Sequence, residues 1–365
     1  MEKKLLIFIP HIKGGGVEKN FFLLSNYLTD KINSIFVITV NKEFKNKLNK
    51  KIKIISPKSN RWQNSPVYLK YFICIILLIK TLLINRKFLI LSFQANWYAI
   101  IIAKFFNTKV VSRSNTAPSG WSKNKFKNYL YKFILNLADE ITVNSLEFKK
   151  LLKKKFNVNS SCVYNPINKQ EIIKRSRVRL DFNFFNSRSL KLINIGRCTE
   201  QKNQILILEA IKYLKDKVPI KLLIAGRGKE FNNLKNYIHL NNLRKNVKLL
   251  NFLPNPYNYI KKSDVFILSS NYEGLPNVLL ESQCLKKMIL STNCPTGPKE
   301  ILLNGRAGIF FKMNNYKDLA HKIEIIYNNK ITMKKKGIVG YNNINRFDEK
   351  TNLNKYYLVL KKYLF

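Results

Sequence analysis

The feature that most constrains the fold of this chain is a regular alternation of short apolar runs with longer helical patterns. The apolar runs have the length of strands, and in the segments between them apolar residues recur every three or four positions. Strands that alternate with helices favour a parallel sheet covered by helices on both faces. In the first half, the predicted strands are 5–10, 34–40, 52–55, 88–93, 110–113, 140–143 and 161–163, and the predicted helices are 17–30, 66–85, 96–106, 123–138 and 145–156.

The same alternation returns after residue 190, and a polar segment separates the two halves. Residues 165–188 are rich in Lys, Arg, Ser and Asn and hold few apolar positions, which predicts a linker. We therefore expect two doubly wound α/β domains at 1–165 and 190–345, a linker at 166–189, and a C-terminal helix at 346–365 that packs back on the first domain. The predicted elements of the second half are strands 191–195, 221–225, 247–249, 265–269, 288–291 and 308–310, helices 203–215, 229–240 and 277–285, and a helical tail from 316 with a charged break near 334–340.

The longest apolar segment, 67–84, allows three interpretations. It is near the lower length limit for a membrane span, but Lys70 and Lys80 interrupt it and a strand-like run follows at once. A buried or half-exposed helix of the first domain is the preferred interpretation. A helix lying in the membrane interface comes second, and a true span comes last.

Charge and cysteine content narrow the class of protein. Lys+Arg 66 against Asp+Glu 21 gives a net charge of +45, which excludes an acidic binding module and favours nucleotides, nucleic acid or an anionic membrane as partners. A bias toward A/T-rich codons explains the same charge, because Lys, Asn, Ile, Phe and Tyr are all abundant. Five scattered cysteines without C-x-x-C and three histidines without H-E-x-x-H disfavour a disulfide framework and a histidine-rich metal site, so a reducing compartment fits.

Two basic residues follow the first strand of the second domain. In INIGRCTEQKNQ, Arg197 and Lys202 lie in the turn between a predicted strand and a predicted helix. Ligands of open α/β sheets bind beyond the carboxyl ends of the strands. A guanidinium and an ammonium there would neutralise a diphosphate, with backbone donors from the helix N-terminus. Because basic residues are common in this chain, the turn by itself is also compatible with a solvated surface.

Two acidic residues follow a later strand of the same domain. In SSNYEGLPNVLLESQCLKK, Glu273 lies in the turn after strand 265–269, and Glu281 lies in the helix that follows. Gly274 lets the backbone approach a ligand closely, and Pro276 suits the first turn of a helix. The N–H groups at this helix start would bind an anion, and the carboxylates would accept hydrogen bonds from sugar or ribose hydroxyls. A pair of glycosidase carboxylates is the competing interpretation, disfavoured because the basic residues prepare the site for a phosphate.

These motifs resemble the retaining GT-B glycosyltransferases of family 4, the glycosyl transferases group 1. The resemblance rests first on Gly-Arg followed by Lys202, and on Glu273-Gly-Leu-Pro followed by Glu281. It implies a GT-B fold, in which two Rossmann-like α/β domains face each other across a cleft. Three further segments resemble the family: KGGGVEKN at 13–20 its N-terminal glycine loop, YNPI at 164–167 its domain junction, and NCPTGPKEIL at 293–302 the segment after the two glutamates in members that build cell-surface polysaccharides.

The resemblance also implies a role for each residue of the site. Arg197 and Lys202 would bind the donor diphosphate, and Glu281 would bind the ribose hydroxyls of the nucleotide. Glu273 would contact the donor sugar, beside the backbone N–H groups of Gly274 and Leu275. Family members generally need no metal, so neither a metal nor a cofactor is expected. The expected catalytic residues are Glu273, Arg197 and Lys202, and the expected donor-binding residues are Gly16, Arg197, Lys202, Glu273, Gly274, Leu275 and Glu281.

Four other residues have weaker assignments. By the resemblance, Gly15 would bring the backbone of the first domain close to the reacting centre. His11 follows the first strand and would either touch the acceptor or pack as a capping residue. Arg113 ends strand 110–113 and is either an acceptor or donor-sugar contact or part of a structural ion pair. Glu200 departs from the family pattern, because an acid beside the diphosphate site either tunes the neighbouring lysine or faces solvent.

The sequence therefore predicts a metal-independent hexosyl- or N-acetylhexosaminyltransferase with retention of configuration. The domain at 190–345 would bind a nucleotide-sugar, with a UDP-sugar preferred, and the domain at 1–165 would bind a lipid-linked or growing surface-glycan acceptor of lipopolysaccharide or capsule. The basic surface and the apolar stretch 71–79 suit a cytoplasmic enzyme that is peripheral on the inner face of the cytoplasmic membrane. There are two alternatives. One is a basic nucleic-acid- or membrane-binding protein, although no nucleic-acid module is recognisable. The other is a GT-B scaffold without catalytic activity, although the presence of both glutamates argues against it.

Overall fold

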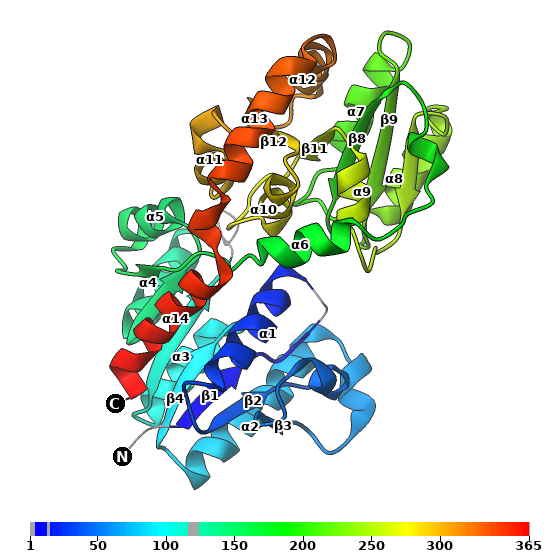
Figure 1. Ribbon diagram of the computed structural model, residues 1–365. Coiled ribbons are helices and arrows are strands. Elements are labelled where there is room, and N and C mark those ends of the chain that lie inside the picture. The colour runs from blue at the N-terminus through cyan, green and yellow to red at the C-terminus, as the bar shows by residue number, and fades with distance from the viewer. Residues whose placement is uncertain (1–3, 13–14, 116–123, 365) are drawn as a thin grey trace. The chain divides into compact units, whose positions relative to one another are not determined.

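The computed structural model of the protein describes residues 4–12, 15–115 and 124–364, which divide into two compact units. Unit 1 combines the chain up to Pro166 with the segment that begins at Glu349, and unit 2 is Ile167–Asp348. Within the described residues, each unit contains one parallel sheet with helices packed on it (Figure 1). The prediction of two doubly wound α/β domains is therefore confirmed.

The sheet of unit 1 has the strand order β3-β2-β1-β4-β5-β6-β7 in the described residues. All residues of the central strand β4 (Phe88–Ser92) are buried, because helices cover both faces of the sheet. The other strands are β1 (Lys4–Phe8), β2 (Ile35–Ile38), β3 (Lys53–Ile55), β5 (Lys109–Ser114), β6 (Glu140–Val143) and β7 (Ser161–Cys162).

Helices cover the two faces of this sheet with segments from different parts of the chain. On one face, α1 (Gly16–Leu28) lies beside the C-terminal helix α14 (Glu349–Leu364), as Figure 1 shows. The hydroxyl oxygens of Tyr356 in α14 and Thr142 in β6 are 2.8 Å apart. Residues near the end of the chain therefore complete the first unit. The opposite face carries α2 (Val67–Ile84), α3 (Asn96–Phe105), α4 (Lys125–Leu137) and α5 (Leu146–Phe156).

The long apolar segment of the sequence is helix α2 of unit 1. Among the residues that the structure describes, it is the one helix whose length and composition would allow it to cross a membrane, with a mean hydropathy of 2.2. Cys74, Leu78 and Leu82 recur every four residues and are fully buried against the sheet. One stripe of α2 is therefore part of the core of unit 1, which agrees with the preferred interpretation of this segment.

The sheet of unit 2 has the strand order β10-β9-β8-β11-β12-β13, and its neighbouring strands are parallel. The strand order changes direction between β8 (Leu190–Ile195) and β11 (Val265–Leu268), and ligands of open α/β sheets bind at such a switch point. The remaining strands are β9 (Ile220–Ala225), β10 (Val247–Leu250), β12 (Met288–Thr292) and β13 (Ile309–Phe311).

The expected linker at 166–189 is part of unit 2 rather than a separate segment. It contains helix α6 (Lys169–Ser176), and the Asn168 side chain caps this helix by accepting a hydrogen bond from the Glu171 N–H at 2.9 Å. The other helices of unit 2 are α7 (Ile205–Leu214), α8 (Phe231–Leu240), α9 (Tyr257–Lys262), α10 (Asn277–Cys284), α11 (Pro298–Ile301), α12 (Tyr316–Asn328) and α13 (Lys330–Asn342).

The expected charged break at 334–340 is wrong, because these residues lie inside helix α13. Gly337 lies inside this helix because its lack of a side chain allows a close contact with another segment. A Cβ at this position would lie 2.3 Å from the carbonyl oxygen of Lys286, so the helix packs against the chain at a distance that only glycine allows. The glycine therefore marks a close contact and not an end of the helix.

Candidate functional site

The candidate site lies at the carboxyl end of the sheet of unit 2, and glycines hold its loops together. A Cβ at Gly226, after β9, would lie 1.7 Å from the carbonyl oxygen of Gly196, after β8. A Cβ at Gly297, where φ is +80°, would lie 2.1 Å from the carbonyl oxygen of Gly274, after β11. Larger residues at 226 and 297 would push these loops apart. The loops therefore form one framework around the switch point of the sheet.

The central feature of this framework is an ion pair between Lys202 and Glu273. The Lys202 ammonium contacts Glu273 Oε1, and Ser270 Oγ donates a hydrogen bond to the same oxygen at 2.7 Å. The side chains are only 16% and 8% exposed. A charge that is mostly removed from water needs a partner, so each residue holds the other in place. The fold thus joins a cation and an acid that are 71 positions apart in the chain.

The turn that carries Glu273 is fixed by the segment after β12. The Glu273 N–H donates to the Pro295 carbonyl at 2.9 Å. Thr296 Oγ1 lies 3.1 Å from the Glu273 carbonyl oxygen and 3.2 Å from that of Gly274. Burial raises the pKa of the nearby Cys294 thiol to about 12, and the negative charge of Glu273 adds to this effect. The carboxylate therefore sits on a rigid, closely packed support.

Glu281 lies one turn into α10 and is 7% exposed. Tyr257 at the start of α9 donates a hydrogen bond from Oη to Glu281 Oε1 at 3.2 Å. The guanidinium carbon of Arg175, from α6, lies 5.1 Å from the centre of the Tyr257 ring. The second predicted carboxylate is thus buried and positioned by residues from α6 and α9.

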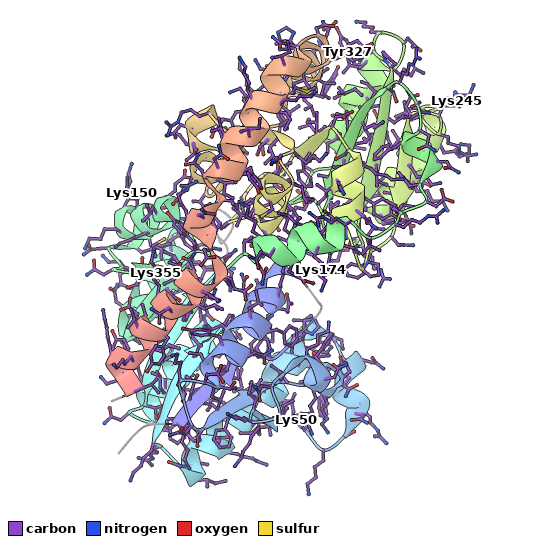
Figure 2. All side chains as sticks on the ribbon, in the orientation of Figure 1. Lys50, Lys150, Lys174, Lys245, Tyr327 and Lys355 are labelled. Atoms are coloured by element: carbon purple, nitrogen blue, oxygen red, sulfur yellow. The ribbon has the colours of Figure 1, made fainter. Side chains whose placement is uncertain are left out.

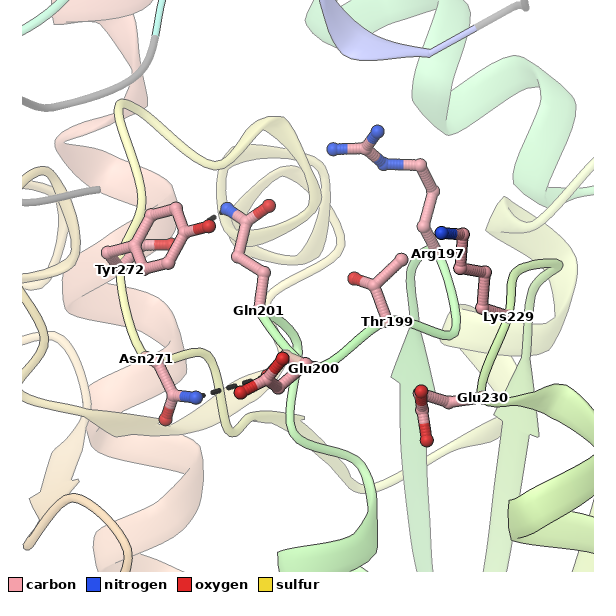
Figure 3. Close-up of a pocket in the computed structure, with 8 residues that line it drawn as sticks. All are labelled: Arg197, Thr199, Glu200, Gln201, Lys229, Glu230, Asn271 and Tyr272. Atoms are coloured by element: carbon pink, nitrogen blue, oxygen red, sulfur yellow. Dashed lines mark hydrogen bonds between the residues drawn. The ribbon is translucent and has the colours of Figure 1, made fainter. Parts of the chain in front are cut away.

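Arg197 is exposed in the loop after β8, beside a hollow of about 410 Å³. Figure 3 shows its side chain extending away from this loop. Two hydrogen bonds frame the hollow: Gln201 Nε2 donates to the Tyr272 carbonyl at 2.9 Å, and Asn271 Nδ2 donates to the Glu200 carbonyl at 3.1 Å. Within the described part of the chain, the lining residues are Arg197, Thr199, Glu200, Gln201, Lys229, Glu230, Asn271 and Tyr272.

The predicted donor residues therefore divide into groups. Lys202 and Glu273 are in direct contact, whereas Arg197 lines the hollow and Glu281 contacts Tyr257. Glu200 is exposed at the hollow, and the carboxylate that pairs with Lys202 belongs to Glu273. The described residues contain no group of three or more His, Cys, Asp or Glu side chains that could hold a metal ion.

In unit 1, the predicted residues lie at the ends of strands and at the start of α1. His11 is buried, with Nδ1 3.4 Å from Asn41 Oδ1 and 3.5 Å from Lys70 Nζ. Gly15 caps α1 and Gly16 is its first residue. Residues 13 and 14 of the predicted glycine loop, and residue 123 of a predicted helix, lie outside the described residues.

Arg113 is 2% exposed, and its described contacts are amides and aromatic rings instead of an acid. Its Nη2 donates to Asn165 Oδ1 at 2.7 Å, and its Nε donates to Asn115 Oδ1 at 3.1 Å. The guanidinium carbon also lies 5.1 Å from the centre of the Tyr356 ring in α14. These contacts connect β5 to two other segments of unit 1, as a structural residue would.

Sequence reasoning missed Ser270 and Tyr257, which position the two carboxylates. Ser270 precedes Glu273 by three residues in the same polar turn, so the local sequence could have indicated that its hydroxyl reaches the Glu273 carboxylate. Tyr257 is in a different loop from Glu281, and nothing in the local sequence connects the two residues.

Comparison with known sequences finds a family model that resembles the second half of the chain. The family model of the glycosyl transferases group 1 matches residues 180–345. A glycosyltransferase of Methanocaldococcus jannaschii, the uncharacterized MJ1059, is 37% identical over 178 residues, which cover 47% of this chain and 44% of that protein. The N-acetylgalactosamine-N,N'-diacetylbacillosaminyl-diphospho-undecaprenol 4-alpha-N-acetylgalactosaminyltransferase of Campylobacter jejuni is 28% identical over 330 residues, 86% of this chain and 87% of that protein.

Solved structures with the same fold cover nearly the whole chain. Anabaena HepE in complex with UDP and glucose has a TM-score of 0.81 at 15% identity, covering 99% of this chain and 100% of that one. Sucrose-phosphate synthase from Thermosynechococcus elongatus has a TM-score of 0.82 at 12% identity, covering 99% and 98%. At these identities the likeness concerns the fold, which is the GT-B type with two Rossmann-like domains.

Proposed function

We propose that the chain is a glycosyltransferase that moves a sugar from a nucleotide-sugar to an acceptor hydroxyl, on the premise that residues 180–345 match the family model of the glycosyl transferases group 1. The observation that carries the proposal is the Lys202–Glu273 pair at the switch point of the sheet of unit 2. It combines a cation for phosphate with an acceptor for sugar hydroxyls at the position where open α/β sheets bind ligands.

Lys202 and Arg197 would bind the diphosphate of the donor. A lysine ammonium has three donors, so Lys202 can hold Glu273 and still donate to phosphate oxygens. Arg197 is exposed and presents a planar guanidinium that suits two phosphate oxygens at once. Both cations would stabilise the charge that builds up on the leaving group, where fixed donors have their largest effect.

The two glutamates would bind the donor by its hydroxyl groups. The described contacts of the Glu273 carboxylate, from Lys202 and Ser270, both fall on Oε1, so Oε2 is available to a sugar hydroxyl. Glu281 would accept from the ribose hydroxyls, with Tyr257 holding its orientation. The backbone N–H groups of Gly274 and Leu275 would lie beside the sugar, as the family resemblance implies.

We expect a retaining reaction without a covalent intermediate. The acceptor oxygen attacks the anomeric carbon on the face that the diphosphate leaves, and the bond from this carbon to the phosphate oxygen breaks. The electron pair of that bond stays on the phosphate oxygen, which takes the proton of the acceptor hydroxyl. The protein's part is to hold the donor and to neutralise the diphosphate, and no metal is required in this scheme.

A UDP-sugar is the proposed donor and a lipid-linked or growing surface glycan the proposed acceptor. HepE structures contain UDP, UDP-glucose, or UDP with glucose, and an Escherichia coli relative is named a UDP-Gal:alpha-D-GlcNAc-diphosphoundecaprenol alpha-1,3-galactosyltransferase. The Campylobacter jejuni relative also acts on a diphospho-undecaprenol substrate by its name. These names support a hexosyl or N-acetylhexosaminyl transfer to a lipid-linked acceptor, and two Staphylococcus aureus relatives named as capsular polysaccharide biosynthesis glycosyltransferases support a role in surface-glycan synthesis. We place this reaction on the cytoplasmic face of the membrane as part of the proposal.

A thermal-shift panel of nucleotides and nucleotide-sugars tests the donor site directly. We expect UDP and a UDP-sugar to raise the melting temperature of the wild-type protein, because a ligand that binds the folded state stabilises it. Arg197→Ala and Glu281→Ala should weaken this response. The matched control Arg244→Ala changes an exposed arginine that precedes the edge strand β10, on the amino-end side of the sheet, and should keep the full response.

Two outcomes would contradict the proposal. One is a wild-type protein that no nucleotide stabilises, and the other is an equal loss of response in Arg197→Ala and Arg244→Ala. Turnover that is unchanged by a chelator would support the metal-free scheme. A product with the inverted anomeric configuration would exclude retention while leaving the donor site intact.

A further inference from the structure

Helices α3 and α4 of unit 1 each present a stripe of large apolar side chains to the solvent. The exposed positions are three, four and seven residues apart on each helix, so each set lies on one helical face. The exposed fractions are 52% for Tyr98, 47% for Ile101 and 84% for Phe105 in α3, and 75% for Phe126, 69% for Tyr129, 38% for Leu130 and 57% for Phe133 in α4. We call these seven side chains the α3–α4 surface.

The opposite faces of the same helices already form part of the core of unit 1. Ala99, Ile100 and Ala103 of α3 are fully buried, and Ile134 and Leu135 of α4 are 3% and 2% exposed. A helix on the surface of a soluble protein normally has a polar outer face, so an apolar outer face indicates a partner.

The two stripes belong to neighbouring helices. The ring of Trp97 in α3 meets the ring of Tyr131 in α4 edge-on, with centroids 4.0 Å apart. Figure 1 shows α3 and α4 together with α5 in unit 1. The exposed aromatic and aliphatic side chains therefore form one surface that spans two helices.

Lysines are exposed on the neighbouring helix α5, which packs against α4. Lys149, Lys150, Lys153 and Lys154 are exposed and line, with Leu146, a hollow of about 520 Å³. Figure 2 labels Lys150 on this helix. Glu147 is the one acid among the five lysines of α5, so the helix keeps a positive charge. The acid Asp139 before β6 is paired with Lys104 and Lys109, at 3.1 and 2.9 Å.

We propose that the α3–α4 surface docks unit 1 onto an anionic lipid bilayer, with the lysines of α5 on the lipid headgroups. Phenylalanine suits the boundary of the acyl chains, and tyrosine suits the headgroup level, where its hydroxyl stays hydrated. Basic residues beside an apolar helix face add the attraction to anionic lipid that holds interfacial proteins. The chemistry of the surface, apolar side chains bordered by positive charge, thus complements a bilayer with negative headgroups.

This assignment places the membrane contact outside the stretch 71–79, although Tyr68, Leu83 and Ile84 near the ends of α2 are also exposed, at 69%, 63% and 88%. In the stretch 71–79, Phe72 is the one described large apolar side chain that is exposed, at 58%, and Cys74 and Leu78 belong to the core. The proposal also goes beyond the function of the donor site, because vesicle binding is measured without any nucleotide-sugar. Failure of the membrane-docking proposal therefore does not imply failure of the proposed glycosyl transfer, and the reverse also holds.

Vesicle flotation with the full chain tests the proposal. Wild-type protein should float with phosphatidylcholine vesicles that contain phosphatidylglycerol, and high salt or omission of phosphatidylglycerol should weaken binding. Phe105→Ser/Phe126→Ser should lower the partition coefficient by about tenfold or more, because two large apolar side chains no longer enter the bilayer. The matched control is Leu240→Ser/Ile331→Ser in unit 2, where the residues are 80% and 70% exposed, and it should bind as wild type does.

Hydrogen exchange on the wild-type protein keeps the test independent of any variant. Vesicles should slow exchange in α3 and α4 and leave α8 unchanged. The proposal is overturned if wild-type protein does not float, if the control pair lowers binding as much as the phenylalanine pair, or if vesicles protect neither helix. It is also overturned if the phenylalanine pair only dissolves a self-associated form without changing flotation, because the surface would then join copies of this chain.

Discussion

The two units use the same α/β plan in different ways at the carboxyl ends of their strands. In unit 2, the loops hold Lys202 and Glu273 as a charged pair and leave Arg197 exposed after β8, so polar groups remain available to a ligand. In unit 1, Arg113 and His11 occupy comparable positions but are buried among amides, a lysine and aromatic rings. A polar residue after a strand is therefore a candidate for binding only if its neighbours leave hydrogen-bonding capacity unused.

The largest expected effect tests whether the charged pair of unit 2 serves chemistry as well as stability. Lys202→Met should lower turnover at least about a hundredfold, because one fixed cation at the leaving group is lost. It should also lower the free energy of unfolding by about 3 kcal/mol, because the mostly buried Glu273 loses its cation. Steady-state kinetics and urea unfolding measure the two effects.

The double variant Lys202→Met/Glu273→Gln separates the effect on turnover from the effect on stability. A neutral amide no longer needs a cation, so the double variant should regain part of the lost stability and none of the turnover. Recovery of turnover together with stability would mean that the pair has only a structural role.

The next effect tests whether Arg113 of unit 1 is structural. Arg113→Met should lower the free energy of unfolding by about 2 kcal/mol, because Asn165 and Asn115 lose their buried donor. The thermal shift caused by UDP should stay at the wild-type value. Arg86→Met, an exposed arginine in the same unit, should change stability by less than about 0.5 kcal/mol. Normal stability with a lost nucleotide response in Arg113→Met would instead make this residue a ligand contact.

A smaller effect concerns the pH dependence of unit 1. Burial by itself raises the pKa of Asp139, but hydrogen bonds from the Val110 N–H, Lys109 and Lys104 outweigh it and leave the pKa below its usual value. A depressed carboxyl pKa contributes stability that is present above the usual pKa and is lost as the pH falls through the folded-state value.

Asp139→Asn measures this contribution. Near neutral pH the variant should be less stable than wild type by about 1 kcal/mol, because the ion pairs and one strong acceptor are lost. In urea titrations, the difference in the free energy of unfolding should shrink as the pH falls below the pKa of a normal aspartate. A difference that stays constant with pH would show that the charge of Asp139 does not matter.

The smallest effect tests a property that the two units share. Burial raises the pKa of the Cys74 thiol in unit 1 and of the Cys294 thiol in unit 2 to about 12 in each case. Both should remain thiols at mildly alkaline pH and resist iodoacetamide, because the thiolate is the reactive form. The half-buried Cys162 should be alkylated first, as peptide mass spectrometry would detect. If iodoacetamide labels Cys74 rapidly and Cys294 slowly, the core of unit 1 opens more readily than the core of unit 2.

The strands and most of the helices could be predicted from the sequence because their signals are local. Strand β6 has the predicted bounds, and β11 differs by one residue, since both are short apolar runs between polar turns. Helix α6 was missed because Lys, Arg and Ser dominate its composition. The spacing of Asn168 and Glu171, a helix-start signal, was present and was outweighed.

The site could be predicted only to the level of its charged residues. Lys202 and Glu273 stood out because each follows a strand at the switch point, and the fold brings them into contact. The burial of Arg113 against Tyr356 could not be foreseen, because the contact joins positions that are far apart in the chain and depends on where α14 packs. The same holds for Tyr257, whose hydrogen bond to Glu281 links two loops.

The return of α14 to unit 1 sets the order in which the protein can mature on the ribosome. Sheet β1 to β7 is translated first, yet its face beside α1 stays uncovered until residues 349–364 have emerged. Unit 2 is translated in between and has all of its strands before then. The part of the chain that is made first is thus completed last, and until then the sheet exposes apolar surface of the kind that makes folding intermediates prone to aggregation.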